Sequence, residues 1–205
     1  LLHSIKMIKG LIIFCLLMGW TIKGQEPYHE KYVIEDSEIH IAGTSNVTDY
    51  NCNLDDFSNN KNIHVETIRQ GKLIELNNAT IRLKALGFDC KNKPITKDFL
   101  EAIKSDEHPH VTIEFLELHL NQYVEESEIQ KNVKALISIR MAGTTQKVNV
   151  YLEKVAFDMN GVRFKGNKTL TMSSFRIEPP TALMGLVKAE DEVRIDFNVY
   201  FKLIQ

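Results

Sequence analysis

The chain is poor in the residues and motifs from which reactive sites are built. Its 205 residues include three cysteines, one tryptophan, five prolines and ten glycines. It contains no Gly-x-Ser-x-Gly, His-Glu-x-x-His or glycine-rich phosphate loop, which are motifs that hold a nucleophile, a zinc ion or a phosphate group. The acidic pairs Asp55-Asp56 and Glu125-Glu126 are typical of solvated turns. The sequence therefore predicts a protein that is not an enzyme and has no catalytic cofactor.

Histidine is the one candidate for metal binding. His108 and His110 fall on the same face at strand spacing, and His64 or His119 could approach them. Two histidines placed in this way can bind a metal ion. We favour the simpler interpretation, in which the pair lies hydrated at the start of a strand, and expect no metal site.

Only the start of the chain has a long apolar run. Leu11 to Trp20 follow the basic stretch Met7-Ile8-Lys9, and a more polar stretch begins at Thr21. The run is too short to span a bilayer comfortably and has the build of a secretory signal peptide. We expect a signal peptide over residues 1–24, with leader residues ahead of the methionine, and a periplasmic or secreted protein without a stable membrane span. A membrane anchor and a buried first helix are the alternatives.

The charge balance bears on the partners of the protein. Residues 1–24 hold three of the 25 bases and none of the 27 acids, so the rest of the chain carries a net charge of −5. A net acidic chain without a basic stripe argues against a nucleic-acid partner. It also lacks the polybasic segment that would attract anionic lipid head groups.

Two cysteines remain after the predicted signal peptide, Cys52 and Cys90. An isolated pair in an oxidising compartment is a candidate disulfide, and two buried thiols are the alternative. A bridge would close a loop of 39 residues, counting both ends, and would stabilise the fold by roughly 4 kcal/mol on the chain-entropy model.

Most of the remaining chain alternates apolar and polar residues. From Val193 to Leu203, odd-numbered positions are apolar and even-numbered ones polar. A period of two predicts a half-buried β-strand. On this signal we expect strands at 37–43, 61–69, 72–86, 110–121, 129–142, 145–158, 161–173 and 191–203, with 31–35 as a candidate further strand.

Two segments depart from simple alternation. In 110–121 the apolar face changes phase after Phe115, which predicts a β-bulge. Between the strands, Thr96 is a candidate helix N-cap, followed by an apolar stripe that includes Phe99 and Ile103. The sequence thus predicts one short helix, ended by His108-Pro109.

Many long antiparallel strands and one short helix predict an all-β closed barrel or a sandwich. Closure removes the edge strands, which are an aggregation hazard. Eight strands enclose an interior that side chains can fill or that can hold one ligand. No linker divides the chain, so we expect one domain over residues 25–205.

Four stretches, in order along the chain, resemble the conserved blocks of the YceI-like family. They are GTSNV at 43–47 followed by Cys52; FDCKNK at 88–93 with KDF at 97–99 and His108-Pro109; MAGTTQKV at 141–148; and FRIEPPTALMGLVK at 175–188 with DEV at 191–193. The last block is the most specific, and together they span roughly residues 30–203.

The resemblance implies a lipocalin-like, extended, eight-stranded antiparallel β-barrel with one short helix. It implies an exported protein with an apolar channel for a polyisoprenoid, such as a polyprenyl lipid or an isoprenoid quinone, and a pairing of Cys52 with Cys90. Asp49-Tyr50 departs from the family pattern, which bears on the shape of the barrel mouth and on the ligand.

A lipid site needs apolar surface rather than reactive groups, because burial alone contributes about 25 cal/mol per Å². The predicted contacts are inward-pointing residues of the strands, and each could equally belong to an ordinary core. They are Phe115, Ile137, Ile139, Met141, Phe164, Met172, Phe197, Val199 and Phe201.

The apolar stretch 179–187 lies between strands, where loops are usually solvated. We expect it to fold over one end of the barrel. Leu183, Met184, Gly185 and Leu186 would then form a lid or portal with the glycine as pivot, or else a satellite core that plugs the barrel.

The sequence thus predicts a carrier or scavenger of an apolar isoprenoid lipid. The main rival is a non-catalytic structural or stress-response barrel with a filled core and no ligand, and a homodimer is a further candidate. An outer-membrane barrel is disfavoured, because such barrels carry aromatic girdles and the single tryptophan, Trp20, lies in the predicted signal peptide.

Overall fold

The computed structural model describes residues 27–122 and 128–204. The predicted signal peptide and the pair Glu125-Glu126 lie outside the described residues. The elements are β1 (Tyr28–Ser45), β2 (Asp49–Leu54), β3 (Ile63–Gln70), β4 (Leu73–Asn77), β5 (Thr80–Lys84), η1 (Ala85–Gly87), α2 (Lys93–Ala102), β6 (His110–His119), β7 (Ile129–Gln130), β8 (Val133–Met141), β9 (Thr144–Asp158), β10 (Gly161–Thr171), η2 (Ser173–Phe175), β11 (Thr181–Ala182), η3 (Leu183–Gly185) and β12 (Val187–Leu203).

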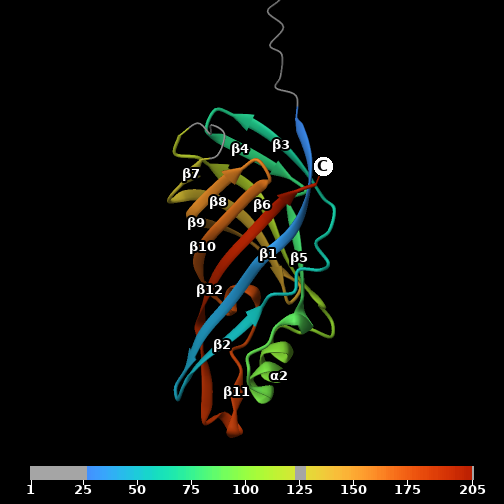
Figure 1. Ribbon diagram of the computed structural model, residues 1–205. Helices are drawn as coiled ribbons and strands as arrows, with labels where there is room; N and C mark the ends of the chain where they lie inside the picture. Colours follow the sequence, from blue (N-terminus) through green and yellow to red (C-terminus); the bar gives the residue numbers. More distant parts are fainter. Residues whose placement is uncertain (1–26, 123–127, 205) are drawn as a thin grey trace, which may run out of the picture.

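The strands form a closed antiparallel barrel of eight strands, elongated along its axis (Figure 1). Around the barrel the order is β1-β3-β4-β6-β8-β9-β10-β12, and β12 pairs with β1 to close it. Strand β5 pairs with β6 beyond β4, β2 pairs with β1, and β11 pairs with β12. The barrel with one α-helix in the described residues confirms the predicted fold class.

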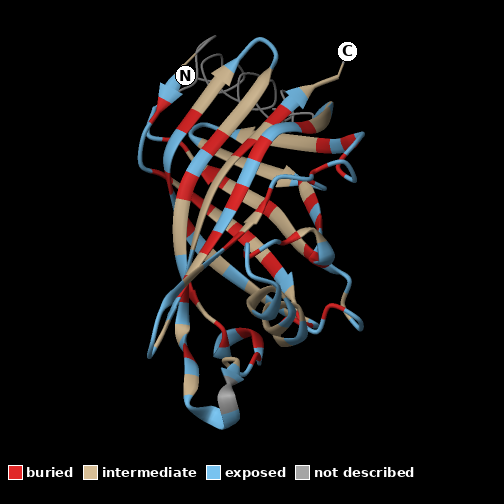
Figure 2. Cartoon of the chain, turned by 60° about the horizontal axis from the view of Figure 1, so that its bottom comes forward, coloured by how far each residue is buried: buried red, intermediate tan, exposed pale blue. Residues whose placement is uncertain are grey.

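Alternation of side chains explains why these segments form a barrel with an apolar interior. In β8, Val133, Ala135, Ile137 and Ile139 are buried, and the residues between them are more exposed. Successive side chains of a strand point to opposite faces, so one face of each strand fills the barrel and the other meets solvent. Figure 2 shows this alternation of buried and exposed residues along the barrel strands.

The pairings of the described barrel strands shift register at four places, and two of these bear on predicted segments. The pairing of β6 with β8 shifts between Phe115 and Glu117, which confirms the bulge predicted from the change of phase. Strand β1 has a second shift between Glu35 and Glu38, where Asp36 has a φ of 42°. The buried Ser37 hydroxyl there accepts a hydrogen bond from the Tyr200 backbone N–H at 2.9 Å. The segments 31–35 and 37–43 are therefore one bulged strand.

Other predicted boundaries were wrong. The expected strand 72–86 is divided at Asn78, whose φ of 63° interrupts extended backbone, and β2 was not predicted as a strand. Helix α2 begins after Asn92, whose side chain accepts a hydrogen bond from the Ile95 N–H, and not at Thr96. It ends at Ala102, ahead of His108-Pro109. None of the helices in the described residues has the length and hydropathy needed to cross a membrane.

Candidate functional site

The interior of the barrel contains a cavity of about 70 Å³, here called cavity 1. Its wall is built from β1, β5, β6, β8, β9, β10 and β12, with the Phe99 ring of α2 at one side. All of the lining residues are apolar except Lys168. Six residues of the predicted lipid-binding set line it: Phe115, Ile137, Ile139, Met141, Phe197 and Val199.

A second cavity of about 150 Å³, cavity 2, lies toward α2 and β11. Met172 of the predicted set lines it. The two cavities share four wall residues, Ile41, Phe99, Met141 and Ile195, and are therefore neighbours separated by side chains. Cavity 2 also has polar groups in its wall, from Ser45, Thr48, Tyr50, Asp98 and Thr181.

The remaining two residues of the predicted set do not line either cavity. Phe164 and Phe201 are buried and pack with Phe115 in a three-ring cluster, with ring centroids 5.1–5.7 Å apart. The Tyr32 ring meets Phe201 edge-on at 6.0 Å. This aromatic cluster lies on the side of the cavities away from α2, beside an open pocket of about 480 Å³ that Tyr32 and Phe164 help to line.

Helix α2 contributes a wall that sequence reasoning did not assign to the site. Ile95, Phe99 and Ala102 line cavity 2, and Phe99 also packs against Phe88 with a centroid distance of 5.3 Å. None of the residues of α2 is buried, so the helix covers the barrel end without being embedded in the core. Its apolar stripe was visible in the sequence and could have indicated a lid, because a helix on a barrel needs an apolar surface to cover.

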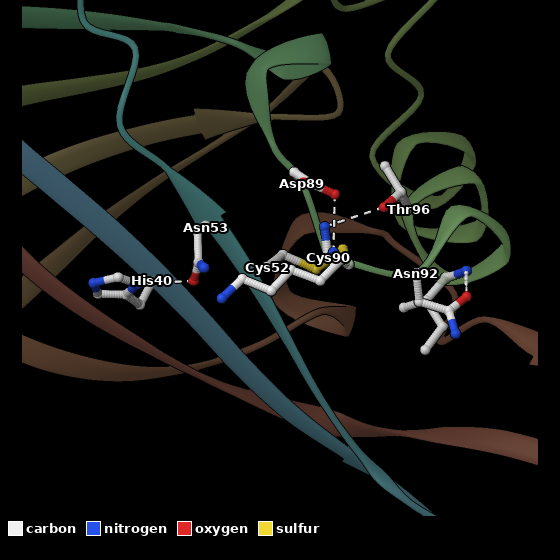
Figure 3. Close-up of a disulfide and its surroundings, with 9 residues drawn as sticks. His40, Cys52, Asn53, Asp89, Cys90, Asn92 and Thr96 are labelled. Atoms are coloured by element: carbon white, nitrogen blue, oxygen red, sulfur yellow. Dashed lines mark hydrogen bonds between the residues drawn. A yellow bond between two sulfur atoms is a disulfide. The ribbon is translucent and has the colours of Figure 1, made fainter.

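A disulfide between Cys52 and Cys90 attaches the segment ahead of α2 to β2 (Figure 3). The backbones also exchange two hydrogen bonds beside it, Asn53 N–H to Asp89 O at 2.9 Å and Asp89 N–H to Asn53 O at 3.0 Å. The Thr96 hydroxyl accepts from the Cys90 N–H at 3.1 Å. The helix that walls both cavities is thus tied to the barrel at its N-terminal side.

The stretch 179–187 was predicted to fold over the barrel, but among its described side chains only those near its two ends contact the cavities. Thr181 and Val187 line cavity 2. Met184 is fully exposed, Leu186 is 74% exposed, and no atom would lie within 4 Å of a side chain built at Gly185. The side chain of Leu183 lies outside what the structure describes. The expected packing of Met184 and Leu186 over the barrel was therefore wrong, because both side chains project into solvent. The role of the stretch as a lid stays a prediction.

Tyr50 and Gly43 shape the wall of cavity 2. Gly43 lies on β1 and Tyr50 on β2, and the two residues are directly opposite each other in the antiparallel pairing of these strands. A Cβ at Gly43 would come within 2.2 Å of the Tyr50 ring, so only glycine lets the phenol lie across β1. Burial raises the pKa of the Tyr50 hydroxyl, which therefore stays protonated and able to donate a hydrogen bond at neutral pH.

Few of the described titratable side chains line the two cavities: Lys168 in cavity 1, and Tyr50 and Asp98 in cavity 2. Within residues 27–122 and 128–204, no three His, Cys, Asp or Glu side chains are grouped so as to hold a metal ion. His108 and His110 line a groove on the outside of the barrel, and His119 meets Glu117 at 3.0 Å. What the interior offers a ligand is apolar surface with a few hydrogen-bonding groups near α2.

Fold and cavities together define the class: a closed, elongated antiparallel barrel with an apolar-lined interior. Two solved structures are similar to it over most of their length. BcnA from Burkholderia cenocepacia matches with a TM-score of 0.54 and 14% identity, over 80% of this chain and 95% of that one. A polyisoprenoid binding domain from Saccharophagus degradans, implicated in plant cell wall breakdown, matches with a TM-score of 0.53 and 8% identity, over 86% and 98%.

The YceI protein of Campylobacter jejuni matches less closely, with a TM-score of 0.43 and 16% identity, over 64% of this chain and 73% of that one. No protein-family model and no curated protein matches the sequence. At identities this low, the structural likeness shows a shared fold.

Proposed function

We propose that this protein binds a long apolar isoprenoid chain, of a polyprenyl lipid or an isoprenoid quinone, inside the barrel, and carries or sequesters it. The observation that supports this most directly is the pair of adjoining cavities, whose shared walls are entirely apolar. A neighbour of the same fold is described as polyisoprenoid-binding. The predicted signal peptide and the disulfide fit an exported carrier.

The cavities are too small to hold a long chain unless their walls rearrange. Volumes of about 70 and 150 Å³ are small beside the roughly 300–1,000 Å³ of ligand pockets. A long chain would therefore need the shared wall to move. Met141 and Phe99 are only partly buried, and a thioether re-packs readily around a ligand. Displacing them would join the two cavities into one elongated channel.

Affinity would come from burial of the chain. An isoprenoid that inserts along the channel removes its apolar surface from water, which contributes about 25 cal/mol of binding free energy per Å². The cost of immobilising the chain opposes this gain. No reactive group is needed for this.

The alternative function is a filled structural barrel without a ligand. The small cavity volumes favour it, because many packed proteins contain a few voids.

Native mass spectrometry of the protein purified from a bacterial periplasm, followed by organic extraction, tests the proposal. We expect a bound species with isoprene-unit mass spacing. Ile139→Phe, which adds volume in the wall of cavity 1, should lower occupancy at least tenfold. Ile129→Phe makes the same change at an exposed site and should leave occupancy unchanged. A protein that stays ligand-free after incubation with isoprenoid quinones would establish the filled barrel instead.

A further inference from the structure

The ladder of hydrogen-bonded strands is interrupted in one place beside cavity 1. Strands β9 and β10 pair from Asp158 and Gly161 as far as Leu152 and Gly166. Beyond that point, residues 144–151 of β9 pair with β8 alone, and residues 167–171 of β10 pair with β12 alone. The two strands, neighbours in the barrel (Figure 1), therefore present unpaired backbone edges to each other over this stretch.

Side-chain hydrogen bonds bound the interruption at both ends. At one end the Asn167 amide donates to the Glu153 carboxylate at 2.5 Å. At the other end the Gln146 amide donates to the Ser174 carbonyl at 2.8 Å. Unpaired backbone groups need water or another partner, so a polar ligand group placed between these limits would meet free N–H donors.

Cavity 1 lies directly behind this interruption. Val150 of β9 and Lys168 and Leu170 of β10 line it from the two unpaired edges, and Leu152 lines it from the last paired position. At the interruption, the wall between the apolar interior and solvent lacks backbone hydrogen bonds between β9 and β10.

Lys168 is an inward-pointing cation at this place. It shares its face of β10 with Phe164, Gly166 and Leu170, which are buried, and alternates with the exposed Lys165 and Thr169. It is half-buried, and among the described residues its ammonium group has no hydrogen bond or ion pair. Its cross-strand neighbour is Ile195, so the inner face supplies no carboxylate to neutralise it.

An unpaired cation beside an apolar cavity costs free energy unless it is hydrated or meets an anion. The end of the interior near α2 has the opposite character, because the charged residue in the wall of cavity 2 is Asp98. A ligand with an apolar chain and an anionic end would therefore place its head at Lys168 and its chain between the barrel walls.

We propose that the interruption between β9 and β10 is a lateral portal, and that Lys168 there selects apolar chains that end in an anionic oxygen group, a phosphate or a carboxylate. This inference rests on the proposed function and names the ligand class of the same site. The free backbone N–H groups of the two edges and the lysine ammonium together would hold the head, while the apolar wall holds the chain.

Binding of matched probes tests the inference. Polyprenyl monophosphate and the polyprenol of equal length are titrated into the wild-type protein by calorimetry, with a fatty acid and its alcohol as a second pair that distinguishes phosphate from carboxylate heads. We expect the anionic member to bind about tenfold more tightly in at least one pair, and the preference to shrink as salt screens the lysine.

Variants assign the preference to the lysine. Lys168→Met should weaken the anionic probe about tenfold and leave the alcohol unchanged, and Lys168→Arg should keep the preference. Lys165→Met removes an outward lysine of the same strand and should change neither affinity.

Two results would overturn the inference while leaving the proposed function intact: equal affinities of the wild type for both members of each pair, or a loss in Lys168→Met that is the same for both. Absence of binding by all four probes would also overturn the inference, and it would overturn the proposed function as well if the protein stayed ligand-free with isoprenoid quinones.

Discussion

The two halves of the barrel interior differ in how completely they are packed. On one side the rings of Phe115, Phe164 and Phe201 stack and meet edge-on at 5.1–5.7 Å. Toward α2, branched aliphatic side chains and the thioethers of Met141 and Met172 leave cavities of about 70 and 150 Å³. Strands β6, β10 and β12 contribute to both halves. Their side chains form the close-packed rings on one side and part of the cavity wall on the other.

The two halves also differ in what lies at their ends. The aromatic half ends in an open pocket of about 480 Å³ that Tyr32, Leu118 and Phe164 help to line. The cavity half is instead closed by α2, which has no buried residue and is tied by one disulfide. Truncating a ring of the close-packed cluster should cost more stability than truncating a side chain that already borders a cavity.

The largest expected effect is a loss of packing in the aromatic half. Phe164→Ala removes a buried ring from the cluster and should lower the free energy of unfolding by about 3–5 kcal/mol. Met141→Ala, at a half-buried position between the cavities, should cost about 1–2 kcal/mol. Urea unfolding of both variants measures the difference, and a cost at Met141 equal to or above that at Phe164 would show that the two halves are packed alike.

An intermediate effect is expected from removal of the disulfide. Replacing Cys52 and Cys90 together by alanine should lower stability by about 2–4 kcal/mol and loosen the attachment of α2. Hydrogen exchange should then speed up at the amides of residues 93–102 and stay slow in the aromatic half. Reduction of the wild-type protein should give the same pattern. Uniform acceleration over both halves would contradict the local role of the bridge.

The smallest effect concerns pH at the cavity half. The hydroxyl and then the backbone N–H of Ser173 donate to the Asp191 carboxylate and lower its pKa below the ordinary 3.8. A lowered pKa stabilises the fold above pH 3.8, and this contribution is lost as the pH falls through the folded-state pKa. Asp191→Asn should therefore lower Tm slightly at pH 7, with a difference that shrinks below pH 3.8.

Thermal unfolding from pH 7 to pH 2.5 measures this, with Glu190→Gln as the control at an exposed neighbouring carboxylate. A difference between wild type and Asp191→Asn that grows on acidification would contradict the assignment.

Features with a local cause could be predicted from the sequence. The bulge at Phe115 was visible because a change of phase in a period of two needs only neighbouring residues. Strand β2 was missed even though Tyr50, Cys52 and Leu54 alternate with polar residues, because those residues are Asp and Asn, which are depleted in strands. The true helix start carried its own signal, Asn92 followed by Pro94.

The site could be predicted only in part. Inward-pointing residues of β8 and β12 were assigned from parity, and six of the nine predicted residues line cavity 1. The division into an aromatic cluster and cavities could not be foreseen, because it depends on how side chains from distant strands fill a common volume. Lys168 shares the parity of Phe164 and Leu170, so its inward direction was readable, but the unpaired edges beside it depend on strand pairing across the whole chain.

The closure of the barrel by β1 and β12 also constrains how the molecule is made. These strands are far apart in the sequence and exchange partners from Tyr32 and Leu203 down to Ser45 and Ala189. Contacts between distant segments form slowly, since a long loop must close first. During synthesis the sheet therefore remains an open ribbon with exposed edges at β1 and β10, and those edges invite intermolecular pairing until β12 is made. For this fold, the concentration of half-made chains matters as much to yield as the stability of finished ones.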